Sequence, residues 1–221
     1  MIDIRPTHRR GFLGRVAAAA VALGLPWSRL EAGGPTPQAG TDHDKWLKGL
    51  NGKHRCLFDF PQPADGLPPV HILNYINTYN TAYQVPDKDI NTVGTFYAFT
   101  TLHGVSDAMW AKYRIGEFLK ANDPATGQPA TKNPWRTEVH ALGMTIAAAS
   151  IEALQKRGTV FILCNNALNY FSGELAKARG AEPKAVYEDL KANLLPGVVL
   201  VPAMVIAIEK AQEAGLAYNR Q

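Results

Sequence analysis

The sequence lacks most of the short motifs that mark a known class of enzyme. It has no glycine-rich phosphate loop, no nucleophilic serine elbow, and no two histidines spaced as in His-x-x-x-His. It also has no internal repeat and no long low-complexity tract. A metal site could arise only through tertiary folding, from the histidines His54, His71, His103 and His140. We therefore expect no metal site.

The net charge is close to zero once the N-terminal segment is excluded. The formal net charge is +4, but the first 40 residues hold five arginines and only two acidic side chains. The remaining residues carry 18 basic and 17 acidic side chains. Because proteins that bind nucleic acid usually present a basic surface, this balance argues against a nucleic-acid partner.

Cysteine is rare, since the 221 residues include only Cys56 and Cys164. Cys56 lies inside a predicted strand, and Cys164 lies at the end of another. A disulfide requires Cα atoms within about 7 Å of each other, and this placement makes such an approach difficult. We predict that Cys56 is a core residue.

No apolar run at the N-terminus is long enough to cross a membrane. The run at residues 16–25 has about half of the roughly 20 residues that a spanning helix needs. It follows Arg9, Arg10, Phe12 and Leu13, and the whole segment resembles a twin-arginine (Tat) export signal. The resemblance implies that residues 1–40 are a signal peptide and linker. It also implies export by the Tat translocon and a mature periplasmic protein that is not in the membrane.

From residue 41 onward, apolar runs alternate with helical patterns, and the overall composition is 46% hydrophobic, as in one globular domain. The patterns predict strands at residues 53–60, 92–102, 160–164, 198–201 and 216–218. They predict helices at 68–83, 106–119, 144–156, 167–195 (broken at Gly180 and Pro183) and 203–213, and a loop at 121–135. This alternation predicts an α/β three-layer sandwich, flavodoxin-like, with a mostly parallel sheet of about five strands between helices.

The stretch at residues 159–168 is the most informative. It combines a buried strand that ends at Cys164, a polar pair, Asn165 and Asn166, and the start of a helix. Ligands of open α/β sheets bind beyond the carboxyl ends of the strands. Backbone N–H groups and the helix dipole would stabilise a thiolate at that place. The same pattern is also typical of a small buried cysteine that only fills space.

Several segments resemble the DsrE/DsrF-like family of sulfur-relay proteins. They are Gly158 to Leu168, Leu194 to Val198, Val201 to Ala203 and Gly215 to Tyr218. In that family a strand of the form apolar-apolar-Cys-x-x-Ala-Leu delivers a cysteine that carries persulfide sulfur, and Cys164 matches that position. The resemblance implies one DsrE-like domain over residues 41–221, with a helical insertion at about 167–195. It also implies a homo-oligomer, a trimer or a hexamer.

Other strand ends supply candidate neighbours for Cys164, because the carboxyl ends of parallel strands meet at one edge. The candidates are Asp59, His103, Asn165, Asn166 and Pro202, with Trp110 and Tyr113 as possible walls. His103 is the candidate acid or base, since its unperturbed pKa is about 6.5. The alternatives are a solvated histidine and aromatic residues that belong to the core.

Two functional hypotheses follow from these observations. In the first, the protein is a sulfur carrier or sulfurtransferase in which Cys164 accepts sulfur as a persulfide and passes it on, without a separate cofactor. The donor and the acceptor, whether a protein or a small thiol, remain open. In the second, the protein is a non-catalytic periplasmic ligand-binding or assembly module. It would use the region of His103, Trp110 and Tyr113 and the helical insertion.

Overall fold

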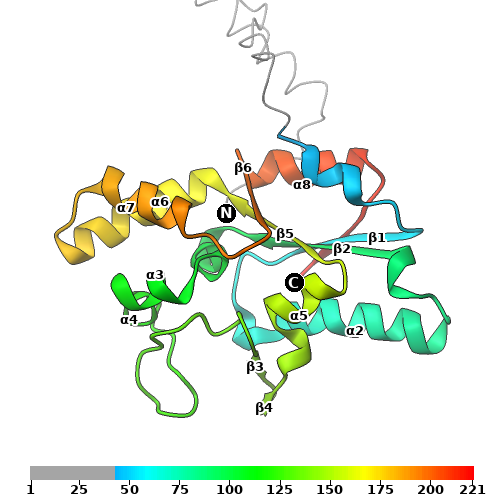
Figure 1. Ribbon diagram of the computed structural model, residues 1–221, viewed down its shortest axis with the longest axis horizontal. Coiled ribbons are helices and arrows are strands. Elements are labelled where there is room, and N and C mark those ends of the chain that lie inside the picture. The colour runs from blue at the N-terminus through cyan, green and yellow to red at the C-terminus, as the bar shows by residue number, and fades with distance from the viewer. Residues whose placement is uncertain (1–42) are drawn as a thin grey trace, which may run out of the picture. The chain divides into compact units, whose positions relative to one another are not determined.

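Five parallel strands form the centre of the structure, a computed structural model that describes residues 43–221 (Figure 1). The order across the sheet is β6 (Val198–Val201), β5 (Val160–Cys164), β2 (Ile90–Phe96), β1 (His54–Asp59) and β7 (Ala217–Arg220). Each neighbouring pair is parallel. The predicted α/β fold with a parallel sheet of five strands is therefore confirmed.

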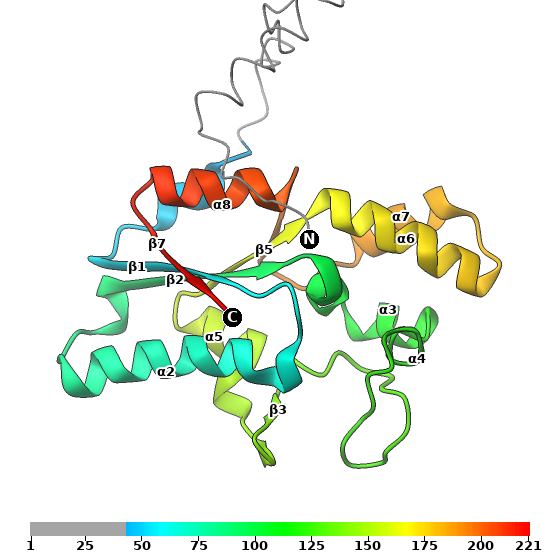
Figure 2. The same ribbon diagram turned by 180° about the vertical axis from the view of Figure 1, so that it is seen from behind.

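Helices cover both faces of the sheet, so the three predicted layers are present (Figures 1 and 2). On one face, here called the α8 face, lie α8 (Met204–Glu213) and the 3₁₀ helix Lys45–Gly49. On the other, the α2 face, lie α2 (Leu67–Ala82) and α5 (Ile151–Lys156). Each face has its own cluster of buried apolar side chains. A parallel strand covered on both faces is usually apolar on both sides, as the central strand β5 is, whereas the edge strand β7 is exposed at every residue.

Two further helices, α6 (Asn165–Arg179) and α7 (Pro183–Ala192), follow β5. Gly180 ends α6 in the left-handed conformation, with φ 63°. Pro183 then occupies the first turn of α7, where its missing N–H costs nothing. The predicted break of this region at Gly180 and Pro183 is confirmed.

The second strand ends six residues earlier than predicted. β2 ends at Phe96, and Ala98–Gly104 form a 3₁₀ helix. Ala98 has a left-handed φ of 48°, and the Thr100 hydroxyl donates a hydrogen bond to the Phe60 carbonyl at 2.8 Å. The β-branched content of residues 92–102 predicted one long strand. Side-chain bonds of this kind to the backbone compete with the strand ladder, and here they replace its end.

The predicted helix at residues 106–119 is two short helices, α3 (Asp107–Lys112) and α4 (Ile115–Leu119). Arg114 separates them in the left-handed conformation, with φ 49°. Gly116 then packs against the backbone of Ala130, which belongs to the long loop. α4, which follows this break, therefore lies against the loop.

The predicted helix at residues 144–156 is wrong in its first half. A short antiparallel hairpin, β3 (His140–Ala141) and β4 (Met144–Thr145), precedes it. Leu142 and Gly143 join the two strands with φ values of 54° and 71°, the two positive values that a tight hairpin turn requires. The α-helix begins only at Ile151, where Ser150 caps it by accepting the Ala153 N–H at 3.2 Å.

The expected export signal, with Arg9, Arg10, Phe12 and Leu13, lies outside the described residues. None of the helices between residues 43 and 221 combines the length and the apolar content needed to cross a bilayer.

Candidate functional site

Cys164 lies where two helices begin. It is the last residue of β5 and the N-cap of α6, a position where Ser, Thr, Asp or Asn usually stands. Its Sγ accepts the backbone N–H groups of Ala167, in the first turn of α6, and of Met204, the first residue of α8, each at 3.4 Å. Both hydrogen bonds and both helix dipoles stabilise negative charge on the sulfur.

The Cys164 side chain is largely buried, with 6% of its surface exposed. It packs in the α8-face cluster with Trp46, Val201 and Met204. Only a small part of the residue is therefore open to solvent, and that part lies at the carboxyl end of the sheet.

A hollow of about 300 Å³ lies against Asn165, the residue after Cys164, and Val201, the residue that pairs with Cys164 on β6. Asn165 and Pro202, two of the predicted neighbours, line it together with Tyr187 and Lys191. The Tyr187 hydroxyl donates to Asn165 Oδ1 at 2.7 Å, and Lys191 Nζ lies 5.5 Å from the centre of the Tyr187 ring. The helical insertion thus contributes directly to the surroundings of the thiol. Asn166, in contrast, points to solvent.

A second hollow, here called the apolar groove, lies along α6 from Ala167 onward and has a volume of about 540 Å³. Its lining consists of Ala98, Phe99, Phe118, Leu119, Lys120, Ala167, Tyr170, Phe171 and Glu174. Ala167, whose N–H binds Sγ, is part of this lining. A hydrogen bond from the Ala167 N–H therefore links the sulfur to the lining of the groove.

His103 is not beside Cys164. It is 97% buried, since 3% of its surface is exposed, and it packs in the core with Trp135 and Trp110, at ring-centre distances of 4.2 and 5.5 Å. Both tryptophans belong to the α2-face cluster, whereas Cys164 belongs to the α8-face cluster. The expected role of His103 as an acid or base for the thiol therefore has no geometric support.

Because His103 is buried, its contribution to the free energy of unfolding depends on pH. Desolvation lowers its pKa from 6.5 to about 4, against a smaller opposing effect of the Thr100 backbone. The unfolded chain therefore binds a proton more readily, so this contribution is complete above pH 6.5 and is lost as the pH falls toward 4. Between about pH 7.5 and pH 5 we expect a loss of about 2 kcal/mol in the free energy of unfolding.

Urea unfolding at those two pH values measures this loss, with the His103→Gln variant as the control. The variant should lose about 2 kcal/mol less than the wild type over the same interval. An identical pH dependence in both proteins would mean that His103 is not the group responsible.

Trp110 and Tyr113 do not line either hollow. Trp110 is fully buried and donates its Nε1–H to the Leu102 carbonyl at 2.9 Å. The Tyr113 hydroxyl donates to Asp189 Oδ2 at 2.7 Å, and Lys112 pairs with the same oxygen at 2.7 Å. These contacts join α3 to α7, so both aromatic residues have structural roles.

Asp59 shares the sheet face of Cys164, but β2 separates the strands that carry them. It is buried at the end of β1 and accepts the Tyr218 hydroxyl at 2.6 Å. Tyr97, which the sequence analysis did not single out, lies between them, because it follows β2 in extended conformation and packs against the α8-face cluster. Burial and then its hydrogen bond to Asp59 raise the pKa of Tyr97. The sequence predicted a strand that continues to residue 102, so Tyr97 was expected inside that strand and not at its end.

Cys56 is a core residue, as predicted, and both cysteines are free. β2 lies between β1 and β5, so two strand spacings, roughly 10 Å, separate the two cysteine-bearing strands. This exceeds the Cα distance that a disulfide allows. Burial raises the pKa of the Cys56 thiol to about 11. Over residues 43–221, no three His, Cys, Asp or Glu side chains gather in a way that could hold a metal ion.

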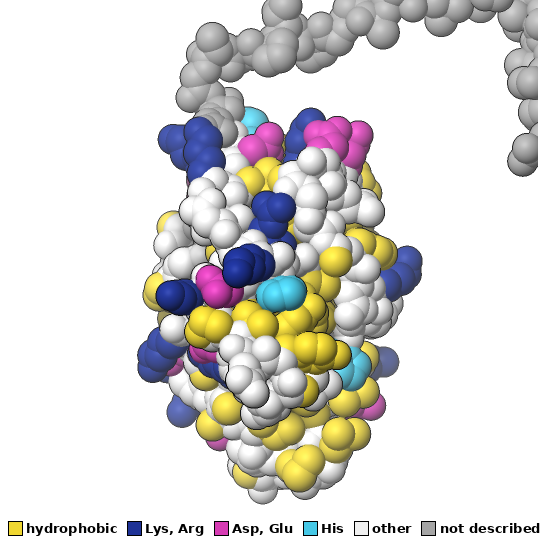
Figure 3. Space-filling view, turned by 90° about the vertical axis from the view of Figure 1, so that its right-hand side faces the viewer, with side chains coloured by type: hydrophobic (Ala, Val, Ile, Leu, Met, Phe, Trp, Pro, Cys, Tyr) yellow, Lys and Arg dark blue, Asp and Glu magenta, His cyan; other side chains and the backbone are white. Residues whose placement is uncertain are grey.

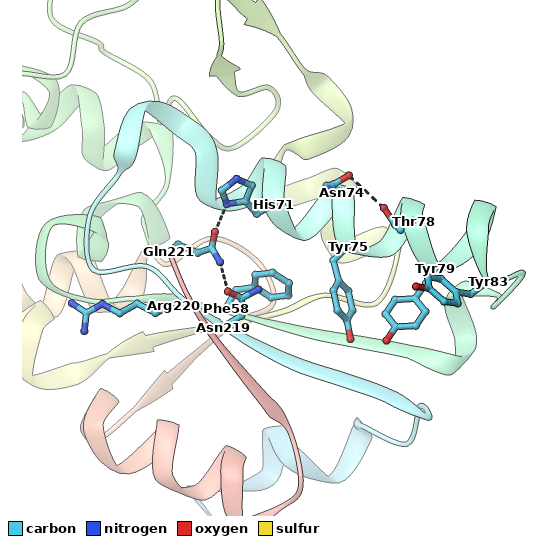
Figure 4. Close-up of a pocket in the computed structure, with 10 residues that line it drawn as sticks. All are labelled: Phe58, His71, Asn74, Tyr75, Thr78, Tyr79, Tyr83, Asn219, Arg220 and Gln221. Atoms are coloured by element: carbon cyan, nitrogen blue, oxygen red, sulfur yellow. Dashed lines mark hydrogen bonds between the residues drawn. The ribbon is translucent and has the colours of Figure 1, made fainter.

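A third cavity, of about 580 Å³, lies between α2 and the edge strand β7 (Figure 4). Tyr75, Tyr79 and Tyr83 follow one another along α2, with ring centres 4.8 and 5.4 Å apart. Phe58 of β1 and the C-terminal residues Asn219, Arg220 and Gln221 line the opposite side. The Phe58 and Tyr75 ring centres are 5.4 Å apart. Figure 3, which views the molecule from the end where α2 finishes, shows hydrophobic side chains gathered below the level of α8.

Fold and site together define an α/β protein with one cysteine held at the carboxyl end of a parallel strand. Comparisons with models of protein families and with curated proteins gave no match. Among solved structures, the chain is similar to a protein of unknown function from Methanobacterium thermoautotrophicum, with 18% identity and a TM-score of 0.37. The match covers 76% of this chain and 99% of that one. The fold assignment rests on the sheet and helices described above.

Proposed function

We propose that the protein carries sulfane sulfur as a persulfide on Cys164. The observation that carries this proposal is the pair of backbone N–H groups, from the first turns of α6 and α8, that point at Sγ. They favour the anionic sulfur that attacks a donor, and afterwards the anionic persulfide. The resemblance of the surrounding segment to DsrE-like sulfur-relay proteins agrees with this proposal.

The transfer needs no external oxidant. The Cys164 thiolate attacks the outer sulfur of a donor persulfide, a bond forms between the two sulfurs, and the donor leaves as a thiolate that takes up a proton. One persulfide and one thiol are consumed, and one persulfide and one thiol are formed. An acceptor thiolate then attacks the outer sulfur on Cys164 and restores the free cysteine by the same exchange.

We further propose that this activity takes place in the periplasm. The support is the segment with Arg9, Arg10, Phe12 and Leu13, which resembles a Tat export signal. We also propose a homo-oligomer, a trimer or a hexamer, because the family that the chain resembles commonly forms such assemblies.

Intact mass of the purified protein, before and after incubation with a persulfide or polysulfide donor, tests the proposal. We expect the gain of one or more sulfur atoms per chain and its reversal by a thiol reductant. A protein that gains no sulfur from several donors of different size would refute the role as a carrier.

A second candidate function, a non-catalytic ligand-binding module, is supported by the cavity between α2 and β7. Its volume of about 580 Å³ is typical of small-molecule sites, and three tyrosines stand in a row along it. The sequence predicted such a pocket around His103, Trp110 and Tyr113, but these side chains are buried in the core. An absorbance spectrum of the purified protein would reveal a coloured ligand that copurifies, and Tyr79→Ala should remove it.

A further inference from the structure

The apolar groove follows one face of α6 that begins at Cys164. Ala167, Tyr170, Phe171 and Glu174 line it, and their spacing of three, four and seven residues places them on one side of the helix. Cys164, the N-cap of α6, precedes Ala167 by three residues, and its Sγ accepts the Ala167 N–H. A molecule lying along the groove therefore has, at one end, the residue that binds the sulfur.

Large aromatic side chains flank the groove in an exposed position. Phe99 is 55% exposed and Tyr170 is 64% exposed, although both are residues that folding normally buries in part. Between them the lining is mainly apolar, and the volume of about 540 Å³ is typical of small-molecule sites. Contiguous exposed apolar surface of this kind marks a place where another molecule binds.

The wall opposite α6 is held by two residues in an unfavourable backbone conformation. Ala98 and Lys120 have φ values of 48° and 55°, in the left-handed region that residues other than glycine rarely adopt. Ala98 directs the chain so that Phe99 follows at the rim, and Lys120 ends α4. Strain of this type persists where the surrounding structure enforces a particular surface.

The groove also carries one uncompensated positive charge. Of its two charged residues, Glu174 is paired with Lys177 at 2.6 Å. Lys120 has no ion pair among residues 43–221. An apolar hollow with a single available ammonium group complements a molecule with an apolar body and one anionic group.

We propose that the apolar groove binds the exchange partner of Cys164, a small thiol or persulfide with an aromatic or aliphatic body and a carboxylate directed to Lys120. This proposal rests on the proposed function and names its substrate class. The outer sulfur of a persulfide extends about 2 Å beyond Sγ, so the reacting atom on the loaded protein is not Sγ itself. Exchange follows the balanced persulfide transfer given above, with the apolar thiol as donor or acceptor.

Loading rates from two donors test the proposal. One donor is the persulfide of 4-mercaptophenylacetate, which is aromatic and anionic, and the other is cysteine persulfide, which is small and polar. We expect Tyr170→Ala to slow loading from the aromatic donor about tenfold, equivalent to about 1.4 kcal/mol, and to leave loading from cysteine persulfide unchanged. Leu142→Ala is the matched control, because Leu142 is similarly exposed, at 70%, and lies in the turn between β3 and β4. It should change neither rate.

A non-reacting probe separates this proposal from the proposed function. Binding of 4-(methylthio)phenylacetate, which cannot exchange sulfur, should be detectable by calorimetry and should weaken about tenfold in Tyr170→Ala. Lys120→Gln should weaken binding of this acid but not of its amide.

Sulfur loading without any binding of this probe would refute the proposal that the groove binds the exchange partner, but it would not contradict the proposed sulfur-carrier function. Binding without loading would refute the carrier function and establish the groove as a ligand site. A probe that binds equally to wild type and Tyr170→Ala would place the ligand elsewhere.

Discussion

Serine in place of Cys164 is expected to abolish sulfur loading completely, whereas Cys56→Ser should load like the wild type. Both cysteines are buried, but they differ in position and in hydrogen bonding. Cys164 lies at a strand end with two N–H donors on its sulfur. Cys56 lies inside β1, between two neighbouring strands, and its thiol has a pKa of about 11 because it is buried. At neutral pH only about one Cys56 in 10⁴ would be ionised even if a donor reached it.

The Cys164→Ser variant should stay folded, so a loss of sulfur loading in this variant would not be due to unfolding. Serine is a preferred N-cap residue, so its hydroxyl can accept the Ala167 N–H that the sulfur now accepts. Intact mass gives the loading, and thermal unfolding of each variant serves as the control for folding. Loading retained in Cys164→Ser but lost in Cys56→Ser would show that the wrong cysteine has been assigned. Loading lost in both variants would point to a reaction that needs both thiols.

Alanine in place of Gly116 is expected to destabilise the domain by at least about 3 kcal/mol, the upper end of the range for overpacked sites. A Cβ at Gly116 would lie 2.2 Å from the Ala130 carbonyl oxygen and 2.5 Å from its nitrogen. These are backbone atoms, so no side-chain rotation can relieve the clash. The Ala130 N–H is also hydrogen-bonded to the Ala121 carbonyl at 2.9 Å, which fixes its position.

Gly173→Ala is the matched control, because Gly173 is also a helical glycine but has no atom within 4 Å of the position of a Cβ. Alanine is favoured over glycine inside a helix by about 1 kcal/mol. We therefore expect Gly173→Ala to raise the melting temperature and Gly116→Ala to lower it. Equal effects of the two substitutions would mean that the loop at residues 121–135 is not held against α4 as the structure has it.

Much of the fold follows from local sequence patterns. The apolar runs at residues 160–164 and 198–201 coincide with β5 and β6, because a strand buried on both faces must be apolar at every position. Gly180 and Pro183 separate α6 from α7, because glycine adopts the left-handed conformation at a helix end without strain and proline is fixed in a conformation that suits a first helical turn. The alternation of these strands and helices predicted the α/β class correctly.

The elements that were predicted wrongly are those in which distant contacts outweigh local preference. The β-branched residues after Phe96 favour a strand, yet Thr100 bonds to the Phe60 carbonyl, 40 residues earlier in the chain. The alanine-rich segment before Ile151 favours a helix, but the preceding hairpin and the Ser150 cap delay its start. Helix propensities differ by less than 1 kcal/mol for most residues, so a few such contacts decide the result.

By itself, the sequence determined the fold class, the strand-end position of Cys164 and the core position of Cys56. These depend on apolar periodicity and on residues with strong local preferences. Only the tertiary structure decided which side chains surround the thiol. Sheet order places Tyr97 beside β5 and Asp59 one strand further away, packing draws His103 into the core on the other face, and α6 and α7 supply the two hollows. Neighbours across a sheet are set by strand order and register, which depend on the packing of the whole chain rather than on any single stretch.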